Sequence, residues 1–315
     1  MTRFGGMIDP ETLSYSDILR LSTRYEELGF SQIAVFDHFY PVYSRNHSVP
    51  LLECWTILAA LTRDTKRIKL GPHVTSSLHR HPGVVAKMAS TVDHLSNGRL
   101  VLGLGAGWYG KESEAFGTPF AGYTERLEKF EEFTVSIKSL LTDPRTNIHG
   151  RYFSFSEALN FPKPLQDPHP PFLIGAQKGS RRMLEIISKH ADIANVGWNL
   201  PPHDLEAKFK ELAGICREVG RYPGKLVQST NVDLLVGKTE KDLKEKIRRT
   251  QRKFSGKYPT MADHVKRMKH GLIGTPGECA EMLDGIKKAG AEMVYLQPLD
   301  LPDLGSIELF ADCVM

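Results

Sequence analysis

The sequence predicts one (β/α)8 barrel, the TIM-barrel fold of the α/β class, over residues 1–315. Short apolar segments alternate with amphipathic helical patterns along the whole chain, and no change in composition marks a boundary between two domains. The segment 82–108 is the clearest example, because a helical pattern leads there into a continuous apolar strand and a glycine-rich turn. A strand that is apolar on both faces is typical of a parallel sheet whose two faces are covered.

Eight short apolar strands are predicted along the chain. They are residues 3–8, 32–36, 68–74, 99–104, 172–174, 193–196, 227–236 and 293–296. The predicted helices are residues 16–28, 52–61, 84–95, 123–141, 180–189, 204–219 and 307–314, with further helical segments up to about residue 289. An irregular insertion is expected at 142–171.

Apolar residues three and four positions apart define the helices, and capping residues define their ends. In the third helix we expect one apolar stripe that consists of Val84, Val85, Met88, Val92 and Leu95. Gly29 supplies the left-handed residue that ends the first helix. Thr275, Pro276 and Glu278 form a capping box with proline at the first helical position.

The composition narrows the class of protein. Lys and Arg together number 41 and Asp and Glu 37, a balance that argues against a dedicated nucleic-acid or membrane surface. The four cysteines, at positions 54, 216, 279 and 313, are scattered and predict neither a disulfide framework nor a zinc site. No apolar run is long enough to span a bilayer, and the N-terminus has no apolar signal core. We therefore expect a cytoplasmic protein that acts on a small molecule.

In a TIM barrel the active site lies at the carboxyl ends of the strands. The residues expected there are Asp37 and His38, Thr75 and Ser76, 105–108, 175–180, Asn195 and Gln297. His38 could move a proton near neutral pH, or it could anchor the following loop. The segment 176–182 offers backbone amides, a serine and three cations at a helix start, which suits a phosphate but also a solvated helix cap.

Two other motifs do not predict a site. The glycines at 103, 105 and 107 are not a dinucleotide fingerprint, because Trp108 occupies the position of its last small residue. His79 and His81 form an H-x-H pair, but it follows the third strand and no carboxylate cluster accompanies it, so no metal is predicted. The strand ends offer no thiolate, activated serine or cation cage, which favours hydride chemistry on a bound cofactor.

A series of segments resembles the luciferase-like monooxygenase superfamily, whose members are flavin or deazaflavin (coenzyme F420) oxidoreductases built on this barrel. The matching segments are 28–38, 70–76, 81–108, Glu112, 115–120, 149–176, 189–198 and 274–296. Asp37-His38, the GAGW turn at 105–108 and HADIANVGW at 190–198 look most like the F420-dependent branch. The resemblance also implies a homodimer.

The resemblance implies a role for each strand-end residue. His38 would be the acid/base, Asp37 would help to hold the ring, and the peptide between His73 and Val74 would be cis and lie behind the ring. The cofactor-binding residues that it implies are Asp37, His73, Val74, Ser76, Gly105, Ala106, Gly107, Gly175, Ala176, Lys178, Gly179, Ser180 and Asn195. Of these, Gly175, Ala176, Gly179 and Ser180 would hold the phosphate. Lys178, Arg181 or Arg182 would be available to the acidic tail of F420.

The chain departs from the sugar-phosphate dehydrogenases of this branch at Trp108, where those enzymes carry a proton-donating glutamate. Trp108 would instead form an apolar wall beside the substrate, and Glu112 would be a second acid or a structural ion-pair partner. The loop 39–50 would exclude water. The sequence thus predicts an F420-dependent oxidoreductase that transfers a hydride between C5 of the deazaflavin and a small organic substrate. The alternatives are an FMN-dependent monooxygenase that uses oxygen and a separate reductase, and a barrel that binds a cofactor without turnover.

Overall fold

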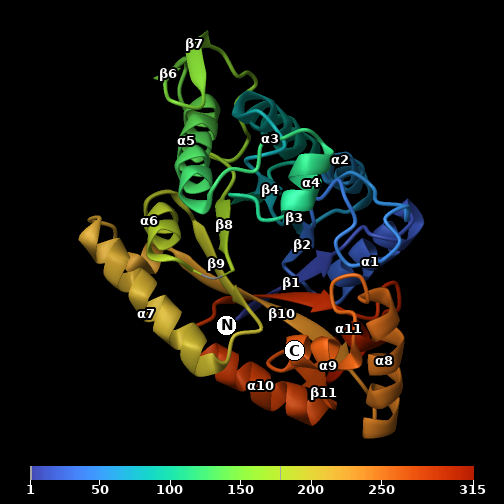
Figure 1. Ribbon diagram of the computed structural model, residues 1–315. Coiled ribbons are helices and arrows are strands. Elements are labelled where there is room, and N and C mark those ends of the chain that lie inside the picture. The colour runs from blue at the N-terminus through green and yellow to red at the C-terminus, as the bar shows by residue number, and fades with distance from the viewer. Residues whose placement is uncertain (1, 178) are drawn as a thin grey trace.

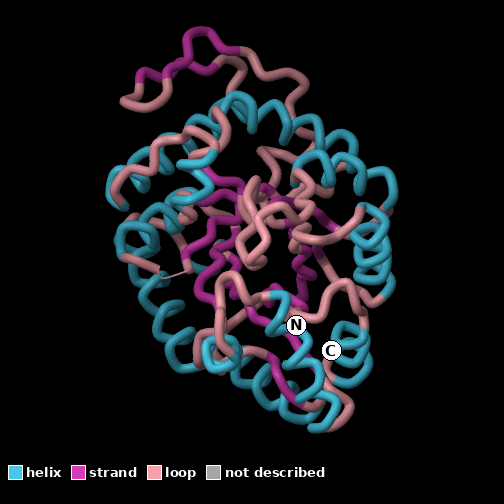
Figure 2. The backbone as a smooth tube through the Cα atoms, turned by 45° about the vertical axis from the view of Figure 1, so that its right-hand side comes forward, coloured by secondary structure: helices cyan, strands magenta, loops and turns pink. Residues whose placement is uncertain are grey.

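Parallel strands form a closed barrel, and helices surround it (Figures 1 and 2). The computed structural model describes residues 2–177 and 179–315. The strands of the sheet are β1 (Arg3–Ile8), β2 (Gln32–Val35), β3 (Lys69–Pro72), β4 (Thr75–Ser76), β5 (Leu102–Gly105), β8 (Phe172–Ala176), β9 (Ile193–Trp198), β10 (Val227–Val236), β11 (Leu272–Gly274) and β12 (Met293–Pro298). The predicted TIM barrel is therefore confirmed.

The sheet runs in the order β3-β2-β1-β12-β10-β9-β8-β5-β4, and β11 pairs with β10 at its end. Hydrogen bonds between β3 and the residues before β5 close the ring. The Leu70 amide donates to the Arg99 carbonyl at 3.1 Å, and the Val101 amide donates to the Leu70 carbonyl at 2.9 Å. Because every strand of this sheet is parallel to its neighbours, all the strands end at the same mouth of the barrel.

The helices pack around the outside of the strands, as the tube view along the barrel shows (Figure 2). They are α1 (Tyr15–Glu27), α2 (Cys54–Asp64), α3 (Pro82–Ser96), α4 (Gly110–Ala115), α5 (Tyr123–Thr142), α6 (Arg181–His190), α7 (Pro202–Glu218), α8 (Glu240–Lys253), α9 (Met261–Met268), α10 (Pro276–Lys288) and α11 (Gly305–Cys313). The predicted capping box at Thr275 and Glu278 opens α10, and Gly29, with φ +82°, follows α1.

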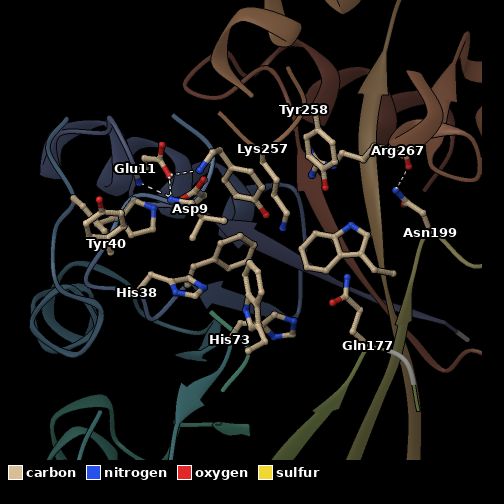
Figure 3. A pocket seen from close by; sticks show the side chains of 17 residues that line it. Asp9, Glu11, His38, Tyr40, His73, Gln177, Asn199, Lys257, Tyr258 and Arg267 are labelled. Atoms are coloured by element: carbon tan, nitrogen blue, oxygen red, sulfur yellow. Dashed lines mark hydrogen bonds between the residues drawn. The ribbon is translucent and has the colours of Figure 1, made fainter. Parts of the chain in front are cut away.

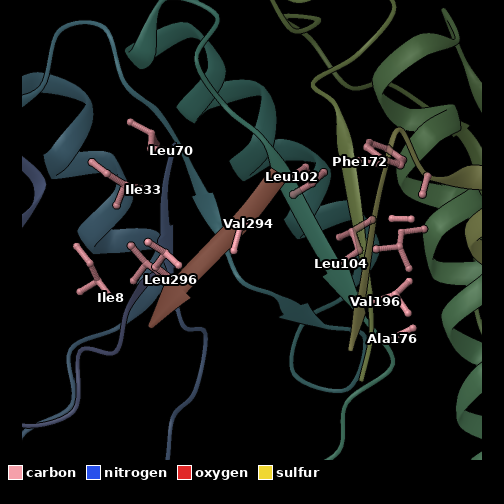
Figure 4. Packing of buried hydrophobic residues seen from close by; sticks show 14 of the residues in the cluster. Ile8, Ile33, Leu70, Leu102, Leu104, Phe172, Ala176, Val196, Val294 and Leu296 are labelled. Atoms are coloured by element: carbon pink, nitrogen blue, oxygen red, sulfur yellow. The ribbon is translucent and has the colours of Figure 1, made fainter. Parts of the chain in front are cut away.

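Successive strand residues belong to two separate apolar clusters, which explains the continuous apolar strands. Ile33 and Val35 pack with the helices in the outer cluster, whereas Ala34 between them belongs to the inner one. In the same way, Val294 and Leu296 point outward and Tyr295 inward. Figure 4 shows the outward-facing side chains of several strands. Both faces of each strand are thus buried, as a parallel barrel requires.

Two expectations about the elements were wrong. Residues 142–171 are not wholly irregular, since they contain an antiparallel hairpin of β6 (Thr146–His149) and β7 (Ser154–Ala158) that projects beyond the barrel (Figures 1 and 2). Most residues of this hairpin are exposed or half-buried, so the sequence carries no apolar alternation there. In α3, Val84 and Leu95 are 51% and 43% exposed; Val85 and Val92 are buried together with Ala86 and Ala89, because small residues complete the stripe.

The close approach of β3 to the start of β5 allows no side chain at Gly71. A Cβ atom there would lie 1.8 Å from the carbonyl oxygen of Val101, which belongs to the backbone and cannot rotate away. We expect Gly71→Ala to lower the free energy of unfolding by roughly 1–3 kcal/mol, measured by urea denaturation. Gly214→Ala is the matched control, because a Cβ in this part of α7 meets nothing within 4 Å. The control should be neutral or stabilise by about 1 kcal/mol. A Gly71→Ala variant as stable as this control would contradict the prediction.

Candidate active site

Two adjoining cavities lie at the carboxyl ends of the strands. The larger, of about 530 Å³, lies over the ends of β3, β5, β8 and β9, and we call it the large cavity. The smaller, of about 230 Å³, lies beside the ends of β1 and β2, and we call it the small cavity (Figure 3). They share five wall residues, which are His38, His73, Trp108, Gln177 and Trp198. The site is therefore one cleft with two compartments.

Fifteen residues predicted to be catalytic or to bind the cofactor lie on the wall of the large cavity. They are Asp37, His38, His73, Val74, Ser76, Gly105, Ala106, Gly107, Trp108, Glu112, Gly175, Ala176, Gly179, Ser180 and Asn195. Thr75 and Gln297, also expected at the strand ends, do not line this cavity and form hydrogen bonds with Asp37 and Arg267. Lys178 lies outside the described residues. Residues from five strand ends thus meet at one place, although their individual roles stay predictions.

His38 is held by a buried carboxylate. Its Nδ1 lies 3.0 Å from Oε2 of Glu112, whose side chain is only 2% exposed, while the His38 side chain is 20% exposed. With the hydrogen on Nδ1, the neutral imidazole leaves Nε2 as a proton acceptor that faces the cleft. Trp108 contacts the same ring edge-on, with 5.7 Å between the ring centroids. Glu112 and Trp108 therefore hold the His38 ring in one orientation at the cleft.

Glu112 has no free oxygen left to serve as a second acid. Its Oε1 accepts hydrogen bonds from the backbone amides of Phe39 and Tyr40, and its Oε2 also lies 3.3 Å from Nε2 of His79. Burial alone would raise the pKa of Glu112, but the hydrogen bond from His38 and the charges of His38 and His79 outweigh it and lower that pKa. Glu112 is thus an ionised residue that positions His38 and the loop after β2. The sequence left two roles open for Glu112, and the geometry favours an ion-pair partner over a second acid.

Asp37 is likewise occupied by protein groups. Its carboxylate accepts two hydrogen bonds from Arg80, at 2.7 and 3.0 Å, and a third from the Thr75 hydroxyl at 2.8 Å. The Asp37 side chain has no exposed surface, and Arg80 also pairs with Glu53. Asp37 thus ties the end of β2 to the segment after β4, and its help in holding a cofactor ring stays a prediction.

The floor of the large cavity has the shape that the resemblance implies. The peptide between His73 and Val74 is cis, as expected. Val74 packs so closely on the glycines of the neighbouring strands that a Cβ at Gly105 would lie 2.5 Å from its Cγ2 atom. Gly107, with φ +76°, is packed so closely that a Cβ there would lie 2.5 Å from Cδ1 of Leu78 and 2.7 Å from Oγ of Ser76. Val74 and Leu78 thus pack directly on glycine backbone, and this gives a mainly apolar floor that suits a flat ring.

A chain of buried amides continues the floor toward β10. His73 Nε2 lies 3.0 Å from Oδ1 of Asn231, and the same oxygen accepts a hydrogen bond from Asn195 at 2.9 Å. Desolvation lowers the pKa of His73 to about 4, so this imidazole is neutral at neutral pH. Nδ1 of His73 has no hydrogen-bond partner among the described residues. Because Nε2 carries the hydrogen that is donated to Asn231, Nδ1 of the neutral ring can accept a hydrogen bond from a ligand, and His73 is not a cation there.

The start of α6 lies at the other end of the large cavity. Ser180 is the N-cap of this helix, and its hydroxyl also lies 2.9 Å from the hydroxyl of Tyr123. Arg181 and Arg182, which the sequence offered as partners for an acidic tail, form ion pairs with Glu218 and Glu131 at the surface. Arg126 is instead the arginine on the described wall of this cavity, and its Nε has no hydrogen-bond partner there.

The sequence interpretation missed several residues of the cleft. Arg126, Asn231 and Lys257 carried no motif, and Arg80 was not considered. His79 was weighed only as part of a metal-binding pair with His81. The structure separates these two, since His79 faces Glu112 and His81 caps the start of α3. Arg80 and Arg126 could have been found in the sequence by considering the cations near the predicted mouth of the barrel.

Residues 2–177 and 179–315 contain neither a cluster of metal ligands nor a helix that could span a membrane. No three His, Cys, Asp or Glu side chains come together there as a metal site would require. In the same part of the chain, no helix combines the length and the apolar character needed to cross a membrane.

The charge of Glu112 has a consequence for stability. Because its pKa is lowered below the usual 4.5, its contribution is fully present above pH 4.5 and is lost as the pH falls through the native pKa. We expect Glu112→Gln to lower the free energy of unfolding by roughly 1–3 kcal/mol at neutral pH, and the difference to shrink below pH 4.5. Urea denaturation at several pH values measures this. Glu114→Gln, an exposed neighbour on α4, is the control and should change little. A difference that does not vary with pH would exclude the charge as its cause.

The family model described as luciferase-like monooxygenase matches residues 1–293. A curated relative, the F420-dependent glucose-6-phosphate dehydrogenase of Amycolatopsis mediterranei, is 29% identical over 63% of this chain and 57% of its own length. The FMNH2-dependent dimethylsulfone monooxygenase of Pseudomonas putida is 31% identical over 51% of this chain and 43% of its own length. The matches therefore span about half the length of these curated relatives.

Solved structures agree with the fold. An F420-dependent secondary alcohol dehydrogenase in complex with an F420-acetone adduct superimposes with a TM-score of 0.84 at 20% identity, covering 99% of this chain and 98% of that one. The coenzyme F420 dependent tetrahydromethanopterin reductase from Methanopyrus kandleri gives a TM-score of 0.80 at 20% identity, with the same coverage. Together with the match over residues 1–293, the barrel and the arrangement of its mouth lead to one conclusion: this chain belongs to the luciferase-like monooxygenase family.

Proposed function

We propose that this protein is an F420-dependent oxidoreductase, which transfers a hydride between a small organic substrate and C5 of the deazaflavin. The observation that carries this proposal is the pair of cavities that share His38. A large compartment with a flat, apolar floor adjoins a small one, and an oriented imidazole stands between them. This is the arrangement that hydride transfer needs, because cofactor and substrate must lie side by side with a proton carrier within reach.

The residues of the large cavity fit a deazaflavin. Val74 and Leu78, packed closely on the glycines 105 and 107, offer a mainly apolar surface for the ring system. The helix start at Ser180 and the guanidinium of Arg126 offer donors for a phosphate at the other end. The cavity of about 530 Å³ is within the range that cofactor-sized ligands occupy. Gly175, Ala176, Gly179 and Asn195 complete this wall.

When bound, a deazaflavin accepts or supplies two electrons as a hydride. His38 then removes the hydroxyl proton of the substrate through Nε2 as the hydride leaves the substrate carbon, or returns that proton in the opposite direction. Glu112 accepts the hydrogen bond from Nδ1 throughout, and its negative charge stabilises the imidazolium that forms. Trp108 packs against His38 and limits its contact with water. The loop 39–50 is tied down by Glu112 and by Glu11, and it covers the small cavity.

Cofactor binding tests the proposal directly. Titration of the purified protein with F420, followed by the fluorescence of the cofactor, should give saturable binding with a dissociation constant on the order of micromolar. FMN under the same conditions is the comparison. We expect Arg126→Gln to weaken F420 binding by about tenfold, because a charge-assisted contact to an anion is lost. Arg151→Gln, which changes an arginine with a 69% exposed side chain near the hairpin, should bind F420 unchanged. Tight FMN binding with oxygen uptake, and no F420 binding, would favour the flavin monooxygenase instead.

His38→Ala separates an enzyme from a barrel that only binds a cofactor. We expect this variant to bind F420 normally but to reduce or oxidise it about 10²–10⁴ times more slowly with a panel of alcohols, aldehydes and enones. The measurement is the change in F420 absorbance with time. His203→Ala is the control, since this imidazole is 80% exposed at the start of α7 and is not among the residues that line either cavity. Equal rates in both variants would remove His38 from the mechanism, and no turnover by the wild type would indicate a binding role.

A further inference from the structure

The small cavity contains a cation, Lys257, that forms no ion pair with a described residue. Lys257 follows α8, and its side chain reaches into this cavity from a different loop than His38 does (Figure 3). Within residues 2–177 and 179–315, its ammonium forms neither a hydrogen bond nor an ion pair. Its Nζ instead lies 4.4 Å from the centroid of the Trp108 ring and 5.2 Å from that of Tyr43. An ammonium that is held against aromatic rings and lacks a counter-ion is a ready partner for an anion.

The other charged groups on this wall have protein partners. Arg267, with a side chain only 5% exposed, pairs with Asp233 at 2.8 Å and donates to Gln297 at 2.9 Å, while its Nη1 has no hydrogen-bond partner among the described residues. Glu11 accepts hydrogen bonds from three backbone amides of the loop 42–44, so its charge is held by the protein. Burial raises the pKa of Asp9 to about 6, so this carboxylate is still mostly ionised at pH 7, and its Oδ1 accepts a hydrogen bond from the backbone amide of Glu11. Of the two cations on the described wall, Lys257 is therefore the one without an ion pair.

The rest of the wall indicates what kind of anion fits. Six aromatic side chains line the small cavity, namely Phe36, Tyr40, Tyr43, Trp108, Trp198 and Tyr258. Its volume of about 230 Å³ is below the range of drug-sized ligands. A single ammonium between rings suits a monoanion with an apolar body. A phosphate dianion usually takes several donors, and here the second cation, Arg267, is already paired.

We propose that the small cavity is the substrate site and that it binds a small organic acid, whose carboxylate pairs with Lys257 while its apolar body lies along the aromatic wall. The reactive carbon would then lie beside His38, because Trp108 contacts both Lys257 and His38. This last point rests on the proposed function, whereas binding of the carboxylate does not. No motif in the sequence assigns this role to Lys257.

The titration of Lys257 gives the proposal a pH dependence. Desolvation lowers the pKa of Lys257 to about 8, and the nearby charge of Arg267 acts in the same direction, while Asp233 and Asp9 oppose it. Tyr43 and Tyr258 also face this ammonium, but their pKa values are raised, so both stay neutral in this range. A carboxylate ligand needs the protonated lysine. Its affinity should therefore fall as the pH rises through the pKa of Lys257.

Calorimetric titration of the full chain, without added cofactor, tests the site. The probes are propionate and benzoate, each paired with its uncharged amide, and phenyl phosphate. We expect at least one carboxylate to bind about tenfold more tightly than its amide at pH about 7, and this preference to disappear near pH 9.5. Lys257→Met should abolish the preference without weakening the amide. Lys257→Arg should keep it at both pH values, because an arginine stays charged.

Matched controls keep the outcome interpretable. Lys241→Met changes an exposed lysine on α8 and should leave every affinity unchanged. The proposal is overturned if no carboxylate binds below about 10 mM, or if Lys257→Met binds the carboxylate as well as the wild type does. The choice of a carboxylate is also overturned if phenyl phosphate binds more tightly than the carboxylates and loses this advantage in Lys257→Met. F420 binding is measured on the same variants and should not change. Carboxylate binding without F420 binding would refute the proposed function alone, and the reverse result would refute this inference alone.

Discussion

The arrangement of the cleft depends on the hydrogen bonds that the buried carboxylate of Glu112 accepts. This carboxylate accepts hydrogen bonds from His38 and from two backbone amides of the following loop, and it lies beside His79. A carboxylate with this many donors is stable as an ion although it is almost fully buried. One side chain on the short helix α4 therefore fixes the tautomer of the imidazole and the start of the loop that covers the small cavity.

The barrel makes this contact possible because all of its strands end at one mouth. Strand residues that alternate between the inner and outer clusters bury both faces of the sheet, and this leaves the strand ends as the place where polar side chains can gather. Close backbone packing at Gly71 and Gly103 belongs to the same design, since a Cβ at either position would meet a carbonyl oxygen of a neighbouring segment. The rigid barrel supports the cleft, and the loops supply its chemistry.

Charge compensation divides the cleft into two different compartments. Around the large cavity, Arg80 neutralises Asp37, and hydrogen bonds stabilise the charge of Glu112. The floor of this cavity is mainly apolar. In the small cavity Arg267 is neutralised by Asp233, but Lys257 is not paired with any described residue. A mainly apolar surface and a chamber with an unpaired lysine lie on either side of the same histidine. This difference between the two compartments is the reason for proposing an acidic substrate in the small cavity beside a cofactor in the large one.

The sequence by itself determined the barrel, eight of its strands and the strand-end residues that line the large cavity, but not the hairpin of β6 and β7 or the short strand β11. The predicted features depend on apolar periodicity and turn residues, which are local properties of the chain. Only the tertiary structure decided the partners of those residues. Glu112 lies 74 positions from His38, Asp37 is paired with Arg80 across 43 positions, and Lys257 meets Trp108 from a distant loop. Which charges are neutralised depends on which loops converge at the mouth, and no local pattern in the sequence encodes that.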